Sequence, residues 1–430
     1  MSQQFVPVSW CRNTTIYEVN IRQYTPEGSF AAFLPHLPRL KEMGVETLWF
    51  MPVMPISVKG RKGSLGSYYA CSSYRKINPE FGTFDEFKQL VAHAHELGLK
   101  VIMDWVANHT GCDHEWTVQH PDYYHVNEQG DFYDKHGWDD VIDLNYENPQ
   151  LRTEMIDSMQ FWVEEVHIDG FRCDMAMLTP VDFWKEARNR LEKVKHLFWF
   201  AELDPLDQPD YMQVFDAAYT WRWMNATRQF KSDGAFQIYS LREQLNDYKS
   251  IVSTHAMGAW FTSNHDENSW NGTEYEKYGE MALPLAVFSA TWEGVPLVYS
   301  GQEIPNHQRL AFFDKNQLDW SQPPRLHAFY KQLFQLRKSH SDCFVMGESD
   351  CGLIQNSVEH HVLTFKRSGK ESTLFIAINF SQHYLPEVEI DMGSSERGVV
   401  EVFSEAHSDP VARFFYVPLE PWSFRIWVKK

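Results

Sequence analysis

The stretch IDGFRCDM, from Ile168 to Met175, is a short, largely apolar segment with a carboxylate near its end. Between Thr14 and Ser300 such segments alternate with longer amphipathic stretches, and their apolar residues run on without polar alternation. That pattern is typical of parallel strands covered on both faces, with helices between them. It predicts an α/β protein, either a closed barrel or a doubly wound sheet. The eight segments are Ile16–Ile21, Val45–Met51, Lys100–Val106, Ile168–Met175, Phe198–Leu203, Asp216–Trp221, Ala259–Asp266 and Pro296–Gln302.

The polar residues at the ends of these segments distinguish the two architectures. A barrel collects the carboxyl ends of all its strands at one face, so such residues converge on a single pocket. A doubly wound nucleotide-binding sheet calls for a glycine fingerprint after the first strand, and the sequence has none there. We therefore predict a (β/α)8 TIM barrel over residues 1–340. The polar residues in question are Asp104, Asp174, Glu202, Asp266, and Gln302 with Glu303.

Three other stretches add detail to this architecture. Residues Thr83–Leu97 place apolar side chains at helical spacing, and Gly98 follows where a left-handed cap is expected. Residues 110–149, after the third strand, are long, polar and rich in His, Asp and Tyr, which predicts a small inserted subdomain that forms one wall of a cleft. Residues 341–430 change to strand-like alternation, which predicts a C-terminal β-sandwich domain.

Charge and composition exclude several classes of partner. The net charge of -19 argues against nucleic acid and against an anionic membrane surface. The six cysteines form no CxxC pair, so neither a zinc ribbon nor a redox dithiol is indicated. The N-terminus lacks the pattern of a signal peptide, and no apolar stretch is long enough to span a membrane. We therefore expect a cytoplasmic protein without a membrane partner.

Three of the strand-end carboxylates fit a glycosidase. A retaining glycosidase needs one carboxylate that attacks the sugar and one carboxylic acid that protonates the leaving oxygen. Arg172 lies two residues before Asp174, on the same side of the strand, and favours its ionised form. The apolar context of Glu202 raises its pKa, as an acid requires. Taken singly, each carboxylate fits a structural role equally well: an ion pair for Asp174, a surface position for Glu202 and a helix cap for Asp266.

Motifs in order along nearly the whole chain resemble those of the α-amylase family of glycoside hydrolases. The family's first signature matches Asp104 with Asn108 and His109, and the other motifs stand at plausible spacings. They are Gly170–Asp174, Ala201-Glu202 and Phe261–Asp266, with Gly66–Tyr69, Asp143–Asn145, Gly294–Pro296 and Gly301–Glu303 as further matches. So many ordered matches make the resemblance highly specific.

The resemblance implies a role for each matched residue. Asp174 would be the nucleophile, Glu202 the general acid/base and Asp266 the stabiliser of the transition state. The remaining residues would bind substrate or support the site: Arg172 holding Asp174, His109 and His265 binding hydroxyls of the sugar at the cleaved bond, Tyr69 stacking on that sugar, and Asp104 giving structural support. Many members bind calcium through the residue that matches Asn108, with carboxylates of the long loop, so calcium is a possible ligand here, although no cofactor is required.

The chain also departs from the family pattern beside the nucleophile. Met175 stands where many members have a small or β-branched residue, and Met177 with Leu178 replaces a Lys-His pair that helps hold the acceptor sugar. The choice between α-1,4 and α-1,6 bonds therefore stays open. The expected activity is hydrolysis of α-glucosidic bonds in starch, maltodextrins or related oligosaccharides, by a monomer. Two alternatives remain: a transglycosylase or isomerase of the same family, and a relative that binds carbohydrate without catalysis.

Overall fold

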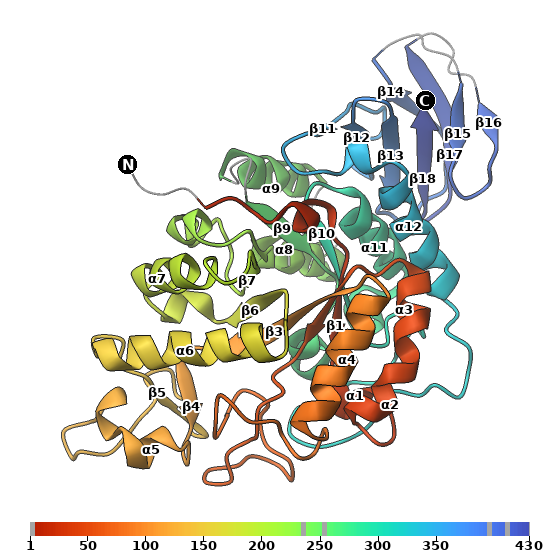
Figure 1. The fold of residues 1–430 in the computed structure, drawn as a ribbon. Coiled ribbons are helices and arrows are strands. Elements are labelled where there is room, and N and C mark those ends of the chain that lie inside the picture. The colour runs from red at the N-terminus through yellow and green to blue at the C-terminus, as the bar shows by residue number, and fades with distance from the viewer. Residues whose placement is uncertain (1–4, 234–237, 252–255, 394–397, 409–412, 430) are drawn as a thin grey trace.

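The predicted barrel is confirmed. The computed structural model describes residues 5–233, 238–251, 256–393, 398–408 and 413–429. Eight parallel strands close into a barrel in the order β1-β10-β9-β8-β7-β6-β3-β2, with helices around the outside (Figure 1). The strands are β1 Ile16–Val19, β2 Thr47–Phe50, β3 Lys100–Val106, β6 Gly170–Asp174, β7 Phe198–Ala201, β8 Ala217–Tyr219, β9 Met257–Trp260 and β10 Val295–Tyr299. Nearly all of their residues are buried, as continuous apolar segments require.

Two predicted strand ends are corrected by the structure. The segment Pro296–Gln302 was expected to end its strand at Gln302, but β10 ends at Tyr299. The segment Ala259–Asp266 was expected to end its strand at Asp266, but β9 ends at Trp260. The pairing of β9 with β10 reaches only Trp260, whose partner is Pro296, and proline has no backbone N–H to donate. Asp266 therefore lies beyond the strand, directly before the helical turn Glu267–Asn271.

The helix predicted over Thr83–Leu97 is present as α4, Phe84–Glu96. Thr83 and Glu86 form a reciprocal capping box at its start, and Gly98 just beyond its end has φ 72°. The other helices of two turns or more are α3 Leu37–Met43, α6 Pro149–Glu165, α7 Val181–Leu191, α8 Trp221–Asp233, α9 Ile238–Ile251, α11 Ala282–Thr291 and α12 His327–Ser339. Among the described residues, no helix combines the length and the apolar character that crossing a membrane would take.

The stretch after β3 forms a small lobe beside the mouth of the barrel (Figure 1). Its core is an antiparallel pair, β4 His109–Gly111 and β5 Val141–Asp143, with the short helix α5, Trp116–Gln119, between them in sequence. The lobe thus begins at His109, one of the residues assigned to the site. The paired strands β4 and β5 lie at the two ends of the lobe in sequence, and the residues between them make up the rest of it.

The C-terminal residues form two antiparallel sheets, which confirms the predicted sandwich. One sheet has the order β11-β12-β13-β18-β15-β16 and the other pairs β14 with β17. Buried apolar side chains from both sheets, among them Phe375, Val388, Val417 and Trp427, make one cluster. The strands are β11 Asp350–Leu353, β12 Val362–Ser368, β13 Thr373–Asn379, β14 Leu385–Asp391, β15 Val399–Glu401, β16 His407–Ser408, β17 Phe414–Leu419 and β18 Phe424–Lys429. The six cysteines are free thiols.

Candidate active site

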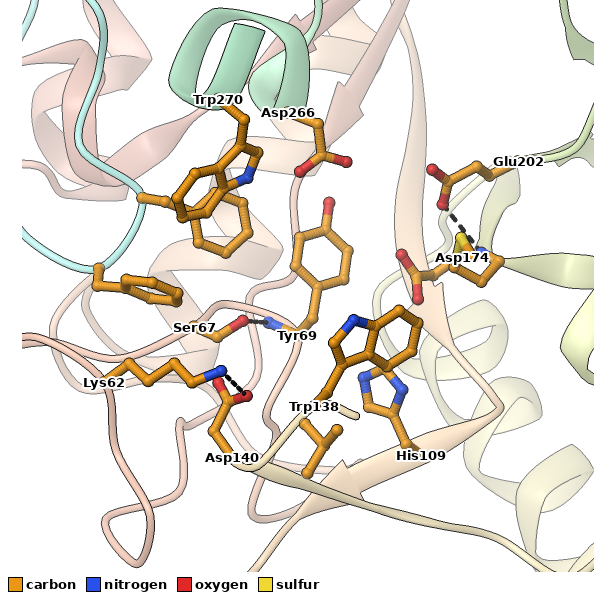
Figure 2. Close-up of a pocket in the computed structure, with 14 residues that line it drawn as sticks. Lys62, Ser67, Tyr69, His109, Trp138, Asp140, Asp174, Glu202, Asp266 and Trp270 are labelled. Atoms are coloured by element: carbon orange, nitrogen blue, oxygen red, sulfur yellow. Dashed lines mark hydrogen bonds and ion pairs between the residues drawn. The ribbon is translucent and has the colours of Figure 1, made fainter. Parts of the chain in front are cut away.

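Three elements bring the three predicted catalytic carboxylates to one cavity. Asp174 is the last residue of β6, Glu202 directly follows β7, and Asp266 lies beyond β9. All three line a cavity of about 380 Å³ at the mouth of the barrel, where Asp174 and Glu202 lie on one side (Figure 2). The same cavity is lined by Lys62, Ser67, Tyr69, His109, Trp138, Asp140, Val141, Met175, Trp270, Phe312 and Phe313.

The guanidinium of Arg172 joins the carboxylates beneath this cavity. Its Nη1 lies 3.0 Å from Oδ1 of Asp174 and 2.8 Å from Oδ1 of Asp104, and its Nη2 lies 2.7 Å from Oε2 of Glu202. The Arg172 side chain is fully buried, so these ion pairs act with little screening by water. One cation therefore holds two of the predicted catalytic carboxylates within reach of each other.

Asp104 lies deeper than the catalytic carboxylates, as its predicted supporting role requires. Besides the ion pair with Arg172, its Oδ2 accepts hydrogen bonds from Oη of Tyr69 over 3.0 Å and from Nε1 of Trp49 over 3.2 Å. These contacts fix Tyr69 in the wall of the cavity. The neighbouring Tyr68 turns away and donates to Oδ1 of Asn20, so Tyr69 is the tyrosine that faces the site.

His265 is held between two carboxylates. Its Nδ1 lies 2.5 Å from Oε1 of Glu18, and its Nε2 lies 2.6 Å from Oη of Tyr69 and 3.4 Å from Oδ2 of Asp266. Its ring stacks on that of Tyr69 with 5.3 Å between centroids. Glu18 was not identified from the sequence. The available signal was a carboxylate inside the first apolar segment, where a buried charge needs a partner.

The pKa values of Asp174 and Glu202 differ in the direction that acid/base chemistry requires. Burial raises the pKa of Glu202 to about 7, against the lowering effect of Arg172. Burial also raises the pKa of Asp174 to about 6, with Arg172 again opposing it. The expected effect of Arg172 on Asp174 therefore has the right sign but is smaller than the effect of burial. Near neutral pH, Asp174 is mostly ionised while much of Glu202 still carries its proton.

The two histidines of the site differ in charge. Burial lowers the pKa of His109 to about 4, so its ring is neutral near pH 7. Burial also opposes protonation of His265, but Asp266 and Glu18 outweigh it and raise the pKa to about 9. His109 also lines the cavity, with its ring edge-on to that of Trp138.

The residues around Asn108 do not fit a calcium site. Its Oδ1, the atom that would bind a hard cation, is taken by Nδ1 of His109. Two carboxylates of the long loop serve other groups: Asp113 accepts from the backbone N–H of Val58 and Lys59, and Asp140 pairs with Lys62. Within the described ranges, no three side chains of His, Cys, Asp or Glu converge as metal ligands.

Several residues that line the cavity were missed or misplaced by sequence reasoning. Trp270 lines the cavity, whereas Trp223 and Trp260 pack in the core. Trp138 was not considered, although its ring packs edge-on against His109 with 5.5 Å between centroids. Lys62, Phe312 and Phe313 come from loops with no strand periodicity, so no sequence pattern marked them. Asp140 belongs to the long loop whose carboxylates were considered only as calcium ligands.

Comparison with known proteins gives matches along most of the chain. A family model described as the alpha amylase catalytic domain matches residues 13–140 and 122–319. Alpha-amylase 3 of Dictyoglomus thermophilum is 25% identical, over 69% of this chain and 64% of that protein. Alpha-amylase MalA of Haloarcula japonica is 24% identical, over 86% of this chain and 56% of that protein. The chain thus spans about three fifths of the length of these curated relatives.

Solved structures agree over the whole length of the chain. A noncanonic maltogenic alpha-amylase from Thermotoga neapolitana superposes with a TM-score of 0.87 and 29% identity, covering 96% of this chain and 98% of that one. An alpha-amylase from Lactobacillus plantarum gives a TM-score of 0.86 and 25% identity, covering 98% of this chain and 100% of that one. The barrel and the C-terminal sandwich are therefore shared features.

Proposed function

The chain belongs to the α-amylase family, and from that membership we propose that it is a retaining glycoside hydrolase that cleaves α-glucosidic bonds in maltodextrins and related oligosaccharides. The observation that carries this proposal is the arrangement of Asp174 and Glu202 on the two terminal nitrogens of Arg172, in one cavity with Asp266. Retaining enzymes need their two carboxyl groups only about 5–5.5 Å apart. A shared guanidinium favours that short separation over the wider one of inverting enzymes.

In the first chemical step, a carboxylate oxygen of Asp174 attacks the anomeric carbon of the bound glucosyl unit. The bond between that carbon and the glycosidic oxygen breaks, and Glu202 transfers its proton to the departing oxygen. The result is a glucosyl ester on Asp174 and a free sugar with a new hydroxyl group. The raised pKa of Glu202, about 7, supports this role because the acid must still hold its proton near neutral pH.

In the second step, Glu202 acts as a base. It removes a proton from a water molecule, whose oxygen attacks the same anomeric carbon, and the ester bond to Asp174 breaks. Two inversions give net retention. Glu202 regains its proton and Asp174 its negative charge, so neither step needs an organic cofactor.

The other residues bind the sugar and the charge that develops on it. The stacked pair of Tyr69 and His265 offers a flat face to the glucosyl ring. His109 and Asp266 line the same cavity and supply hydrogen-bonding groups for its hydroxyls. Asp266 also carries negative charge toward the oxocarbenium-like transition state, where that charge is most stabilising.

Product analysis over time tests the proposal. Maltoheptaose, pullulan, isomaltose, sucrose and trehalose are incubated with the protein and with Asp174→Asn, and the products are separated by chromatography. Shorter maltodextrins from the wild type, with none from Asp174→Asn, support hydrolysis. Longer or isomeric sugars would instead indicate a transglycosylase or isomerase, in which a sugar hydroxyl replaces water in the second step. No product from any of the five substrates contradicts the proposed function.

A further inference from the structure

The chemistry proposed above fixes the orientation of the substrate in the cavity. Glu202 protonates the departing oxygen, so the leaving part of the substrate lies on the Glu202 side. The glucosyl unit that is transferred to Asp174 lies over Tyr69, and any further units of the non-reducing end extend away from Glu202. Figure 2 shows Lys62 and Asp140 on that opposite side of the cavity, with Tyr69 between them and the catalytic carboxylates.

An ion-paired bridge crosses this far side. Nζ of Lys62 lies 2.6 Å from Oδ1 of Asp139 and 3.0 Å from Oδ1 of Asp140. Lys62 belongs to the loop after β2, whereas the two aspartates belong to the lobe after β3. The bridge therefore ties together two walls of the cavity that are separate in the sequence.

The loop that carries Lys62 is fixed on its other side as well. The backbone N–H of Leu65 donates to the carbonyl oxygen of Phe313 over 2.9 Å, and Ser64 donates to Oδ1 of Asp314 through its backbone N–H and its hydroxyl. Gly63, at φ 59°, approaches Phe313 so closely that a Cβ at this position would lie 2.6 Å from the Cβ of Phe313. A larger residue would push the two loops apart.

Three loops thus meet where a long glucan chain would have to continue: residues 57–66, the lobe after β3, and residues 309–316. We propose that this closure makes the site a pocket for the non-reducing end of the substrate, with room for no more than two glucosyl units before the cleaved bond. The cavity of about 380 Å³ lies near the small end of the range for small-molecule sites, about 300–1,000 Å³.

The groups that close the pocket suit a chain end. Lys62 and Asp140 both line the cavity, so an ammonium donor and a carboxylate acceptor face the terminal hydroxyls. Phe313 and Trp138 add apolar surface beside them. The proposal rests on the function proposed above and specifies it further: the protein attacks from chain ends and releases glucose or maltose.

A blocked substrate tests this directly. The 4-nitrophenyl glycoside of maltoheptaose is compared with the same compound whose non-reducing end carries a 4,6-ethylidene group, and products are separated by chromatography. We expect the blocked compound to react at least tenfold more slowly in kcat/KM, and the free compound to lose glucose or maltose from its non-reducing end from the earliest times.

The double variant Lys62→Ala/Asp140→Ala removes the two charged residues of the bridge that line the cavity and leaves only Asp139, whose side chain is largely exposed to solvent. It should lower the preference for the free over the blocked substrate several-fold. Lys76→Ala is the matched control, because Lys76 pairs with Glu115 elsewhere on the lobe and should leave the preference unchanged. Thermal unfolding of each variant verifies that it is folded.

The outcomes separate the two proposals. Equal cleavage of both compounds by the wild type, with products from the middle of the chain, would overturn the closed pocket and leave the hydrolase intact. A discriminating wild type whose double variant discriminates equally well would show that the bridge is not what closes the site. Cleavage of neither compound would contradict the proposed function, and this inference with it.

Discussion

The backbone N–H of Met175 donates a hydrogen bond of 2.9 Å to Oε2 of Glu202. Met175 directly follows Asp174, so the turn that ends β6 also holds the carboxyl group that follows β7. Its φ of 38° lies in the left-handed region, which few residues other than glycine adopt. The two carboxyl groups are therefore linked through the backbone as well as through Arg172.

Replacing Glu202 by glutamine should affect substrates according to their leaving groups. Glutamine cannot transfer a proton, so kcat/KM on maltotriose should fall by about 10²–10⁴. α-Maltosyl fluoride needs no proton for departure of fluoride, so its first step should lose far less. Single-turnover kinetics on both substrates measures the difference. Asp174→Asn is the control and should lose both activities, because attack on the anomeric carbon is needed in each case. Equal losses with Glu202→Gln would contradict its role as the acid.

The pH dependence of kcat/KM should be a narrow bell. Activity requires Asp174 ionised, and its pKa is raised to about 6 by burial, so the rate should fall as pH drops below that value. Activity also requires Glu202 protonated, and its pKa is raised to about 7, so the rate should fall as pH rises above it. Because the two groups interact, the two apparent pKa values read from the profile belong to the pair and not to either residue alone. With α-maltosyl fluoride the alkaline limb of the first step should weaken, and a limb that stayed unchanged would require another group.

Arg172→Met should destabilise the protein strongly at neutral pH. The variant leaves three buried carboxylates without their cation, and losing one partner of a buried ion pair costs about 3–5 kcal/mol. Without the cation, the pKa values of these carboxyl groups rise further above their unfolded values. The folded state then binds more protons, so the loss of stability should shrink as pH falls from 8 to 5.

Urea unfolding at several pH values measures this effect. Arg309→Met is the matched control, because Arg309 forms a solvent-exposed ion pair with Glu276 and its replacement should change the free energy of unfolding little at any pH. A penalty for Arg172→Met that did not change with pH would mean that packing, rather than charge, is what this arginine contributes.

Removing divalent cations should leave the activity unchanged. Oδ1 of Asn108 is already engaged by His109, and Lys62 occupies the carboxylates of Asp139 and Asp140. The measurement is the initial rate on maltotriose and the midpoint of thermal unfolding, before and after dialysis against a chelator. A loss that added calcium restores would place a metal site at residues other than those considered above.

The strand ends were the most predictable part of the site. Arg172 and Asp174 share a face of β6 because side chains alternate along a strand, and this local rule needs no knowledge of the rest of the protein. Glu202 and Asp104 followed in the same way from the convergence of strand ends in a barrel. Asp266 was recognised from its motif, but its place beyond β9 was not, because the end of that strand depends on pairing with Pro296.

The sequence by itself determined the barrel, the C-terminal sandwich and the residues gathered at the barrel mouth, because strand and helix periodicities are local and repeat many times. Only the tertiary structure decided what surrounds the catalytic groups. The partner of His265 is Glu18, from the first strand, and the far wall joins Lys62 to Asp140 from another loop. Such contacts depend on how distant loops pack against each other, and loops carry no periodic signal from which that packing can be derived.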